Sequence, residues 1–505
     1  MGETIKLSAA PLSVLRTVND KLMSYNVEFT EVTGGTFWKA YTPEQIAGTE
    51  KFHVDGATDI MSAMASLMQM YPPINLYDEK LRKLAKEFGP VWVRVSGTWA
   101  TKTYYDFDGT TNGVAPEGYQ NILTKEQWTG VLDFVKAIGA KLLISVANCE
   151  GLHKADEPWN PSQAEIIFKY SRDYGVPIDA AEFTNEPNIL DVTGFPPGYT
   201  AEDYARDQDL FFKWLRANYP DTLCVGPCST EGSMGDSQKQ EPGSGGIADL
   251  SGNCASTDDL MRGTVEPIDV YSYHYYNGVS ERLELVMPAM HWDSDKVLSE
   301  RYLAVAPNCA KENAPRRDKY CPDGEMWVTE SGDAGGGGDT WASTYTDVFR
   351  TLNELGSFAT ITDGVIFHNT LASSDYGFLK HGTFDPRPNY FAALLWNRIM
   401  GTTVYDTKEE IREGAHVYAH SRKDGKDGIA YLIINNSENE ATTVTLPKTA
   451  ECYTLSAPSL RSSTMYLNGK ALVLGADNEL PDMSPEIKEA GDVALEPASI
   501  MFVVL

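Results

Sequence analysis

The sequence has few basic residues and no long apolar run. Lys and Arg number 42 against 71 Asp and Glu, which gives a formal net charge of −29 at pH 7. This shortage of positive charge argues against nucleic acid and anionic lipid as partners, because both bind broad basic surfaces. No apolar run of about 18 residues occurs, so we expect no membrane-spanning helix. We therefore expect neither nucleic acid nor a membrane among the partners.

Several metal-binding and cofactor-binding motifs are also missing. The seven cysteines form no CxxC pair, so a zinc site is not expected. No G-x-G-x-x-G follows the first apolar segment, and no P-loop is present, which argues against dinucleotide and nucleoside triphosphate sites.

The sequence carries little information about the cellular location. Residues 1–7 contain neither the charged nor the apolar region of a signal peptide. We expect a secreted or periplasmic protein whose signal has been removed, with a cytoplasmic location as the alternative. Cys309 and Cys321 bracket a polar segment that reads as a loop. Either a disulfide between them or two reduced thiols fits this spacing, so the redox compartment stays open.

Short apolar segments alternate with amphipathic ones from about residue 26 to about residue 400. The predicted strands are residues 26–32, 91–96, 141–146, 179–184, 223–226, 269–275, 326–329 and 364–367. The predicted helices are residues 81–88, 124–138 (with Thr124 and Gln127 as a capping box), 161–174, 201–219, 340–355 and 390–400. Eight strands alternating with helices predict an α/β fold, a (β/α)₈ TIM barrel, with a doubly wound open sheet as the alternative.

The pattern changes after residue 400. Short strand-like runs at residues 416–421, 429–435, 441–446, 452–456, 471–474 and 500–505 are separated by turn residues. They predict a C-terminal all-β sandwich. The expected organisation is a catalytic barrel at 26–400, a β-sandwich at 401–505, and an N-terminal segment at 1–25 that joins the sandwich.

Two carboxylates follow barrel strands at the end where such barrels hold their active sites. Glu186 follows the fourth predicted strand and Glu330 the seventh. Glycosidic hydrolysis needs such a pair, one to protonate the leaving oxygen and one to attack the anomeric carbon or activate water. Two surface carboxylates at loop starts are the alternative, and Glu150 is a competing acid. Asn185 could bind a sugar hydroxyl, and His274 is either a core histidine or part of the site.

The motifs around these residues resemble those of glycoside hydrolase family 79, which includes β-glucuronidases, heparanases and leech-type hyaluronidases. Residues 184–188 (TNEPN) look like its acid/base motif, and residues 328–331 (VTES), followed by a glycine run, like its nucleophile motif. Further similar segments are residues 95–98, 274–278, 375–379, 384–391, 400–404 and 467–470.

The resemblance implies a retaining mechanism, with Glu330 as nucleophile, Glu186 as acid/base and a carboxyl separation of roughly 5–5.5 Å. It also implies recognition of a uronic acid. The substrate-binding residues that it implies are Asn185, Tyr276, His274, Thr98, Tyr376 through its hydroxyl, and Gly336 and Gly337 through backbone N–H groups. Glu28 and Glu31 are both possible as the acidic residue of the first strand.

One departure from the family bears on the substrate. Heparanases carry lysines soon after the Asn-Glu-Pro motif, and residues 188–193 contain no base. This argues against sulfated heparan chains. A basic cluster of Lys311, Arg316, Arg317 and Lys319 is either a solvated loop or a contact for a distal part of an acidic glycan.

The sequence thus predicts a retaining β-glucuronidase that removes terminal β-linked glucuronic acid, or its 4-O-methyl ether, from glycans or glycosides. One alternative is an endo-β-glucuronidase of the heparanase or hyaluronidase kind. Another is a non-catalytic carbohydrate-binding protein. The expected partner is a uronic-acid-containing glycan or glycoside. The chemistry requires no metal or organic cofactor, because carboxyl groups and water suffice.

Overall fold

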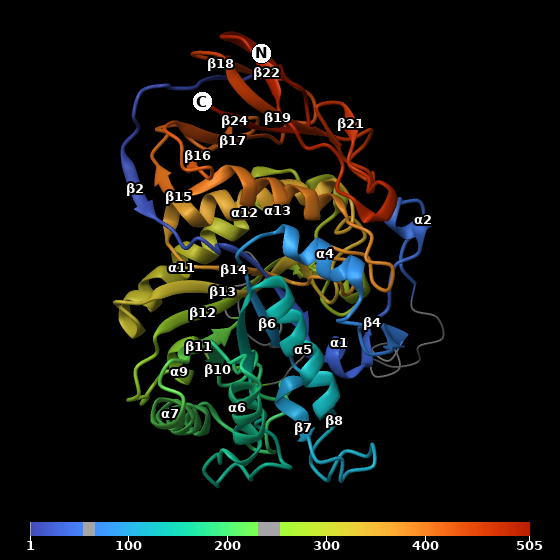
Figure 1. Cartoon of the computed structure of the whole chain (residues 1–505), viewed down its shortest axis with the longest axis vertical. Helices are drawn as coiled ribbons and strands as arrows, with labels where there is room; N and C mark the ends of the chain where they lie inside the picture. Colours follow the sequence, from blue (N-terminus) through green and yellow to red (C-terminus); the bar gives the residue numbers. More distant parts are fainter. Residues whose placement is uncertain (1, 54–65, 231–252) are drawn as a thin grey trace.

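The main body of the protein is a closed barrel of eight parallel strands (Figure 1). The computed structural model describes residues 2–53, 66–230 and 253–505. In chain order the barrel strands are β3 (Met23–Glu28), β6 (Trp92–Ser96), β9 (Lys141–Ser145), β10 (Ala180–Glu182), β11 (Leu223–Ser229), β12 (Val270–Val279), β13 (Glu325–Gly335) and β14 (Ile366–His368). Closure occurs where β14 pairs with β3. The predicted (β/α)₈ barrel is confirmed, and the open sheet is excluded.

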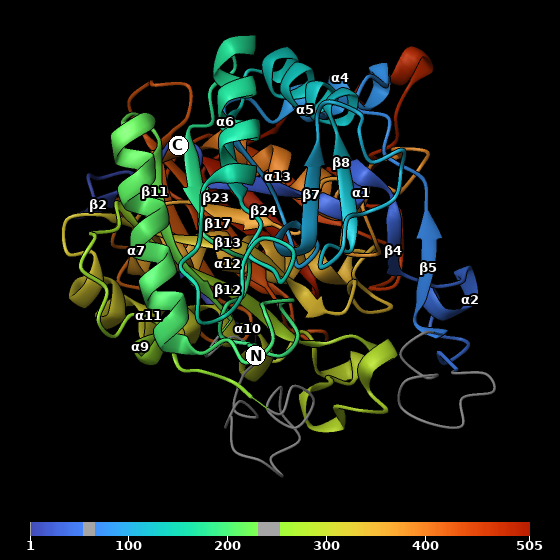
Figure 2. The same ribbon diagram turned by 90° about the horizontal axis from the view of Figure 1, so that it is seen from below.

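Helices cover the outside of the barrel. They are α4 (Glu79–Glu87), α5 (Lys125–Ile138), α6 (Ser162–Tyr174), α7 (Ala201–Asn218), α11 (Val305–Tyr320), α12 (Thr346–Ile361) and α13 (Pro388–Ile399). Helices α4 to α7 follow one another around one side (Figure 2). The predicted capping box of α5 is confirmed, since Thr124 accepts from the Gln127 backbone and Gln127 from the Thr124 backbone. Within the described ranges, no helix is both long enough and apolar enough to cross a bilayer.

The first barrel strand differs from its predicted bounds. It ends at Glu28, and the short helix α1 (Phe29–Thr33) replaces the second half of the expected strand 26–32. The cause is local, because the Glu31 side chain accepts from the Glu28 backbone N–H at 2.8 Å and caps the helix.

The predicted helix at 340–355 begins later than expected, at Thr346. The backbone N–H groups of Tyr345 and Thr346 donate instead to carbonyls of Ser462 and Leu460 in the C-terminal region. Tertiary hydrogen bonds therefore replace the expected first helical turns.

The polar segment between Cys309 and Cys321 is a helix, so the prediction of a loop is wrong. Cys309 lies inside α11 and Cys321 caps its C-terminus. A helix rises about 1.5 Å per residue, which separates the two cysteines by about 18 Å, too far for a disulfide. No disulfide joins any of the seven cysteines, all of which lie in the described ranges. The basic cluster of Lys311, Arg316, Arg317 and Lys319 lies on this helix.

The C-terminal region forms two facing sheets, and the larger one packs against α12 and α13 (Figure 1). The larger sheet runs β2 (Val14–Thr17), β15 (Met400–Tyr405), β16 (His416–Arg422), β17 (Ile429–Asn435), β24 (Ser499–Val504), β19 (Ala450–Ser456), β20 (Tyr466–Leu467) and β21 (Lys470–Ala471), with β22 (Glu486–Lys488) also on β19. The smaller sheet runs β1 (Thr4–Lys6), β18 (Thr442–Leu446) and β23 (Gly491–Leu495). Both N-terminal strands, β1 and β2, thus pair with C-terminal strands. Buried Ile5, Val444 and Ile433 belong to the core between the sheets.

Candidate active site

A cavity of about 380 Å³ opens at the C-terminal ends of the barrel strands. Seven of the nine predicted site residues line it: Thr98, Asn185, Glu186, Tyr276, Glu330, Gly336 and Tyr376. The other two are His274, which is fully buried between the two carboxylates, and Gly337, which is not part of the cavity lining.

The two carboxyl groups lie close together. Glu330 is in β13, and Glu186 follows β10 with a φ of 44°, a backbone conformation uncommon outside glycine. One oxygen of each, together with a ring nitrogen of His274, lie within 4.8 Å of one another. This separation is close to the roughly 5–5.5 Å of retaining glycosidases and shorter than the roughly 6.5–9.5 Å of inverting ones.

The pKa of Glu186 lies above its ordinary value. Burial raises its pKa to about 7, against an opposing effect of the nearby Arg94 guanidinium. Its Oε1 lies 3.0 Å from Nδ1 of His274.

His274 fixes the orientation of this carboxyl group. Burial lowers the pKa of His274 to about 4, so the ring is neutral near pH 7. Nη2 of Arg94 lies 3.3 Å from Nε2, and a guanidinium can only donate, so Nε2 accepts. The single ring proton is therefore on Nδ1, which donates to Oε1 of Glu186. Oε2 of Glu186 is left as the oxygen that carries the exchangeable proton.

Glu330 is surrounded by hydrogen-bond donors. The Tyr276 hydroxyl donates to Oε1 at 2.5 Å, and Nη1 of Arg94 donates to Oε2 at 3.1 Å. Nδ2 of Asn369 lies 3.4 Å from Oε1. Donors on both oxygens fix the orientation of the Glu330 carboxyl group.

Arg94, in the middle of β6, connects the whole group. Besides Glu330, it donates to Oε2 of Glu182 and to Oδ1 of Asn185, each at 2.8 Å. Arg94 and Glu182 are both buried, so each supplies the counter-charge that the other needs.

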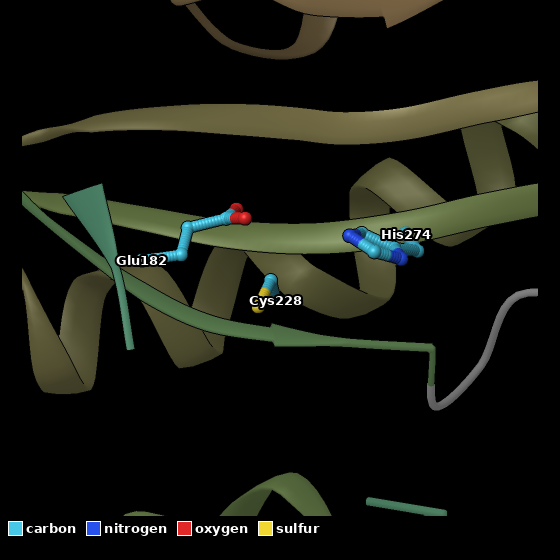
Figure 3. A group of neighbouring side chains, drawn as sticks. All are labelled: Glu182, Cys228 and His274. Carbon is cyan, nitrogen blue, oxygen red and sulfur yellow. The ribbon is translucent and has the colours of Figure 1, made fainter. Parts of the chain in front are cut away.

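A group of three side chains that could in principle bind a metal ion lies deeper in the barrel. Figure 3 shows Glu182, Cys228 and His274 around one region of the barrel interior. Arg94 already binds Oε2 of Glu182 and Nε2 of His274, and the Cys228 thiol donates to the Thr184 carbonyl at 2.7 Å. Burial also raises the pKa of Cys228 well above its usual value. A protonated thiol and a guanidinium do not fit a metal site, and Arg94 provides the positive charge here.

The first-strand acid at the cavity is Glu28. Glu31 lies behind it, buried, with one oxygen on the Glu28 backbone N–H. Burial and the nearby Glu330 carboxylate raise the pKa of Glu28 well above its usual range. A protonated Glu28 can donate to a sugar hydroxyl and does not repel an anionic sugar.

The glycine run is fixed by a buried arginine. Arg282 donates through Nη1 to the carbonyls of Gly336 (3.1 Å) and Gly338 (2.8 Å). Carbonyl and N–H point in opposite directions across a trans peptide, so the Gly337 N–H points away from Arg282. The φ angles of Gly336 and Gly337 are 91° and 89°, and a Cβ on Gly337 would lie 2.6 Å from Cβ of Trp38. Only glycine fits there.

Sequence reasoning missed several residues of the site. Arg94 lies within the predicted strand 91–96 and Asn369 follows the predicted strand 364–367, but no motif distinguished them from ordinary polar residues. Nδ2 of Asn369 lies 3.0 Å from the hydroxyls of both Tyr276 and Tyr376 and 3.1 Å from Oε1 of Glu28. Lys102 also lines the cavity, from the turn after β6. For Arg94 and Asn369, a position in or just after a predicted strand was the only signal available.

Comparison with known proteins finds relatives along most of the chain. No protein-family model matches. Heparanase-like protein 1 of Arabidopsis thaliana is 26% identical, covering 84% of this chain and 83% of its own. Hyaluronoglucuronidase of Hirudo nipponia is 25% identical (86% and 90%), and baicalin-β-D-glucuronidase of Scutellaria baicalensis 24% (86% and 84%). Inactive heparanase-2 of Mus musculus is 23% identical (76% and 67%).

Solved structures show the same fold. A 4-O-α-L-rhamnosyl-β-D-glucuronidase from Fusarium oxysporum superposes with a TM-score of 0.59 at 13% identity, covering 99% of this chain and 100% of that one. A family 51 α-L-arabinofuranosidase from Thermotoga petrophila gives 0.57 at 14% identity (97% and 98%).

The fold, the relatives and the paired carboxylates together define a glycoside hydrolase. The homologues of this chain include heparanase-like proteins, a baicalin glucuronidase and a hyaluronoglucuronidase. The resemblance to family 79, the glucuronidase and heparanase family, is thereby confirmed.

Proposed function

We propose that the protein is a retaining β-glucuronidase that releases terminal β-linked glucuronic acid, or its 4-O-methyl ether, from a glycan or glycoside. The observation that carries the proposal is the contrast between two neighbouring carboxyl groups. Burial raises the pKa of Glu186 to about 7, whereas Glu330 accepts from Tyr276 and Arg94. Such a contrast supports Glu186 as the acid and Glu330 as the nucleophile.

The reaction proceeds in two steps. Glu330 attacks the anomeric carbon while the proton on Oε2 of Glu186 passes to the leaving oxygen, which breaks the glycosidic bond and forms a glycosyl ester on Glu330. Glu186, now ionised, removes a proton from water. That water attacks the anomeric carbon, breaks the ester and returns Glu330 as a carboxylate.

Neutral groups bind the carboxylate of the sugar. The backbone N–H groups of Gly336 and Gly337 and the Tyr376 hydroxyl are donors without formal charge. The Tyr376 hydroxyl already accepts from Asn369, which leaves its own proton for the substrate. A single anionic sugar can therefore bind a strongly acidic protein without a basic surface.

Hydrolysis of 4-nitrophenyl β-D-glucuronide tests the proposal. We expect the wild-type protein to cleave it and the Glu330→Gln variant to be inactive. Unchanged hydrolysis by Glu330→Gln would refute the assignment, and equal rates on the matching β-glucoside would refute the carboxylate-binding role of Gly336, Gly337 and Tyr376.

The main alternative is endo-action on a uronic-acid polysaccharide, which the names of the heparanase-like and hyaluronoglucuronidase relatives suggest. The products from a defined glucuronate-containing oligosaccharide separate the two. Release of monosaccharide supports exo-action, and internal fragments support endo-action. A non-catalytic carbohydrate-binding protein is less well supported, because both carboxylates and their partners are present.

A further inference from the structure

Lys102 is a cation in the cavity that the proposed mechanism does not use. It ends the short 3₁₀ turn Ala100–Lys102 after β6 and lines the cavity together with Trp99. Its ammonium group lies 4.7 Å from the centroid of a Trp99 ring. Burial lowers the pKa of Lys102, which indicates an ammonium group partly withdrawn from water.

This ammonium group has no anionic partner. In the part of the chain that the structure describes, Nζ of Lys102 forms neither an ion pair nor a hydrogen bond, and its contact is the Trp99 ring. Acidic residues outnumber basic ones 71 to 42 in this chain, so an unpaired cation inside a cavity is unexpected. A partly buried charge without a counter-ion costs stability, and that cost is offset when a ligand supplies the opposite charge.

The side chain has a defined place. Gly194 lies against its stem, and a Cβ on Gly194 would lie 2.5 Å from Cδ of Lys102. Gly194 has a φ of 96°, so glycine is favoured there on both grounds. The stem of Lys102 thus packs against Gly194, and its ammonium group lies over the Trp99 ring on the cavity wall.

That position is at the leaving-group end of the cavity. Ile189 and Val192 line the cavity beside Lys102 and belong to the turn that begins at Glu186, since Ile189 N–H donates to the Glu186 carbonyl at 3.2 Å. In the proposed mechanism Glu186 protonates the leaving oxygen, so the unit joined to that oxygen lies against this turn.

We propose that Lys102 binds an anionic group, a carboxylate or a sulfate, on the unit next to the glucuronate. Trp99, Ile189 and Val192 form the apolar wall on which that unit packs. The inference rests on the proposed function and narrows it to acidic glucuronides, whether the leaving unit is an aromatic acid or an acidic sugar. One cation accommodates one such group, in agreement with an otherwise acidic protein.

Matched substrates test this. We would compare 4-nitrophenyl β-D-glucuronide with its ring-carboxylated analogue, and a glucuronyl disaccharide with its form sulfated on the second sugar. For each protein we would take the ratio of kcat/KM for the acidic substrate over the neutral one. This ratio removes any effect of a substitution that is common to both substrates. We expect Lys102→Met to lower this ratio about tenfold, the loss of one charge-assisted hydrogen bond. The aryl pair and the sugar pair show which kind of leaving unit is preferred.

Two control variants and the effect of added salt define the outcome. Lys102→Arg keeps the cation and should keep the ratio. Lys125→Met removes a lysine that also lies over an aromatic ring (Tyr170, 5.3 Å) but outside the cavity, and should leave the ratio unchanged. Added salt should reduce the wild-type ratio and not that of Lys102→Met, because salt screens the ion pair.

The failures of the two proposals are distinguishable. If the wild-type protein cleaves no glucuronide, the proposed function fails and this inference fails with it. If it cleaves both members of each pair and Lys102→Met leaves both ratios unchanged, this inference alone is overturned.

Discussion

Nδ1 of His274 donates to Oε1 of Glu186 at 3.0 Å, and this bond fixes the orientation of the Glu186 carboxyl group. Arg94 donates to Nε2, the other ring nitrogen, so neutral His274 can bind Glu186 only as a hydrogen-bond donor. The proton of Glu186 then lies on Oε2. In the proposed mechanism, acid/base function at the leaving oxygen thus depends on a buried neutral histidine that does not itself line the cavity.

The pH dependence of activity follows from Glu186. Its pKa is raised to about 7 by burial, and only the protonated form can protonate the leaving oxygen. We therefore expect kcat/KM to fall as pH rises through about 7, measured on a glucuronide with a poor leaving group. Glu186→Gln should lose about 10²–10⁴-fold on that substrate, a typical contribution of a general acid, and should lose the alkaline limb. An alkaline limb that persists in Glu186→Gln would assign it to another group.

Azide should distinguish the two carboxylates by the product each variant forms. In Glu186→Ala the covalent intermediate still forms from an activated aryl substrate, and azide entering the vacated space attacks it to give β-glucuronosyl azide. In Glu330→Ala azide replaces the nucleophile and attacks the substrate directly, which gives the α-azide. The anomeric coupling constant of each product reads out the configuration.

The control for that experiment is Glu150→Gln. Glu150 is exposed and forms a salt bridge with Lys154 at 2.8 Å. This variant should retain wild-type activity and give no azide product. Azide products of the opposite configurations would exchange the roles of Glu186 and Glu330.

Folding stability should depend on pH through Glu31. Burial raises its pKa from 4.5 to about 8, and its Oε1 has no hydrogen-bond partner. Between these values the unfolded chain loses the Glu31 proton while the folded protein keeps it, so stability falls as pH rises, by about 1.4 kcal/mol per pH unit. In Glu31→Gln the amide oxygen can still accept from the Glu28 N–H, and this pH dependence disappears.

Denaturant unfolding at a series of pH values checks this. The variant should gain stability over wild type steadily from about pH 5 to about pH 8. Parallel curves for the two proteins across this range would contradict the buried, protonated state of Glu31.

The barrel was predictable because its signal is repeated. Each of the eight strands is a short apolar segment, and all eight were found in the right order even where the bounds differed. Glu186 and Glu330 followed from the same argument, because strand order alone puts their two loops at one end of the barrel.

The rest required three-dimensional information. Helix α11 contains Pro315 and many polar residues, so its sequence resembles a loop, and tertiary packing of residues such as Cys309 and Asn313 decides its structure. Arg94 and Asn369 act through contacts with residues far away in the chain, which local patterns do not encode. The same holds for Lys102, which comes from the turn after β6, whereas the heparanase pattern places lysines after the Asn-Glu-Pro motif.

The anomeric form of the first product tests the central claim most directly. Proton NMR of 4-nitrophenyl β-D-glucuronide hydrolysis, recorded within the first minutes, separates β-glucuronic acid from the α-anomer that forms later by mutarotation. With Glu330 as nucleophile and Glu186 as acid/base, we expect the β-anomer to appear first. Initial release of the α-anomer would mean direct attack by water and would contradict the retaining mechanism.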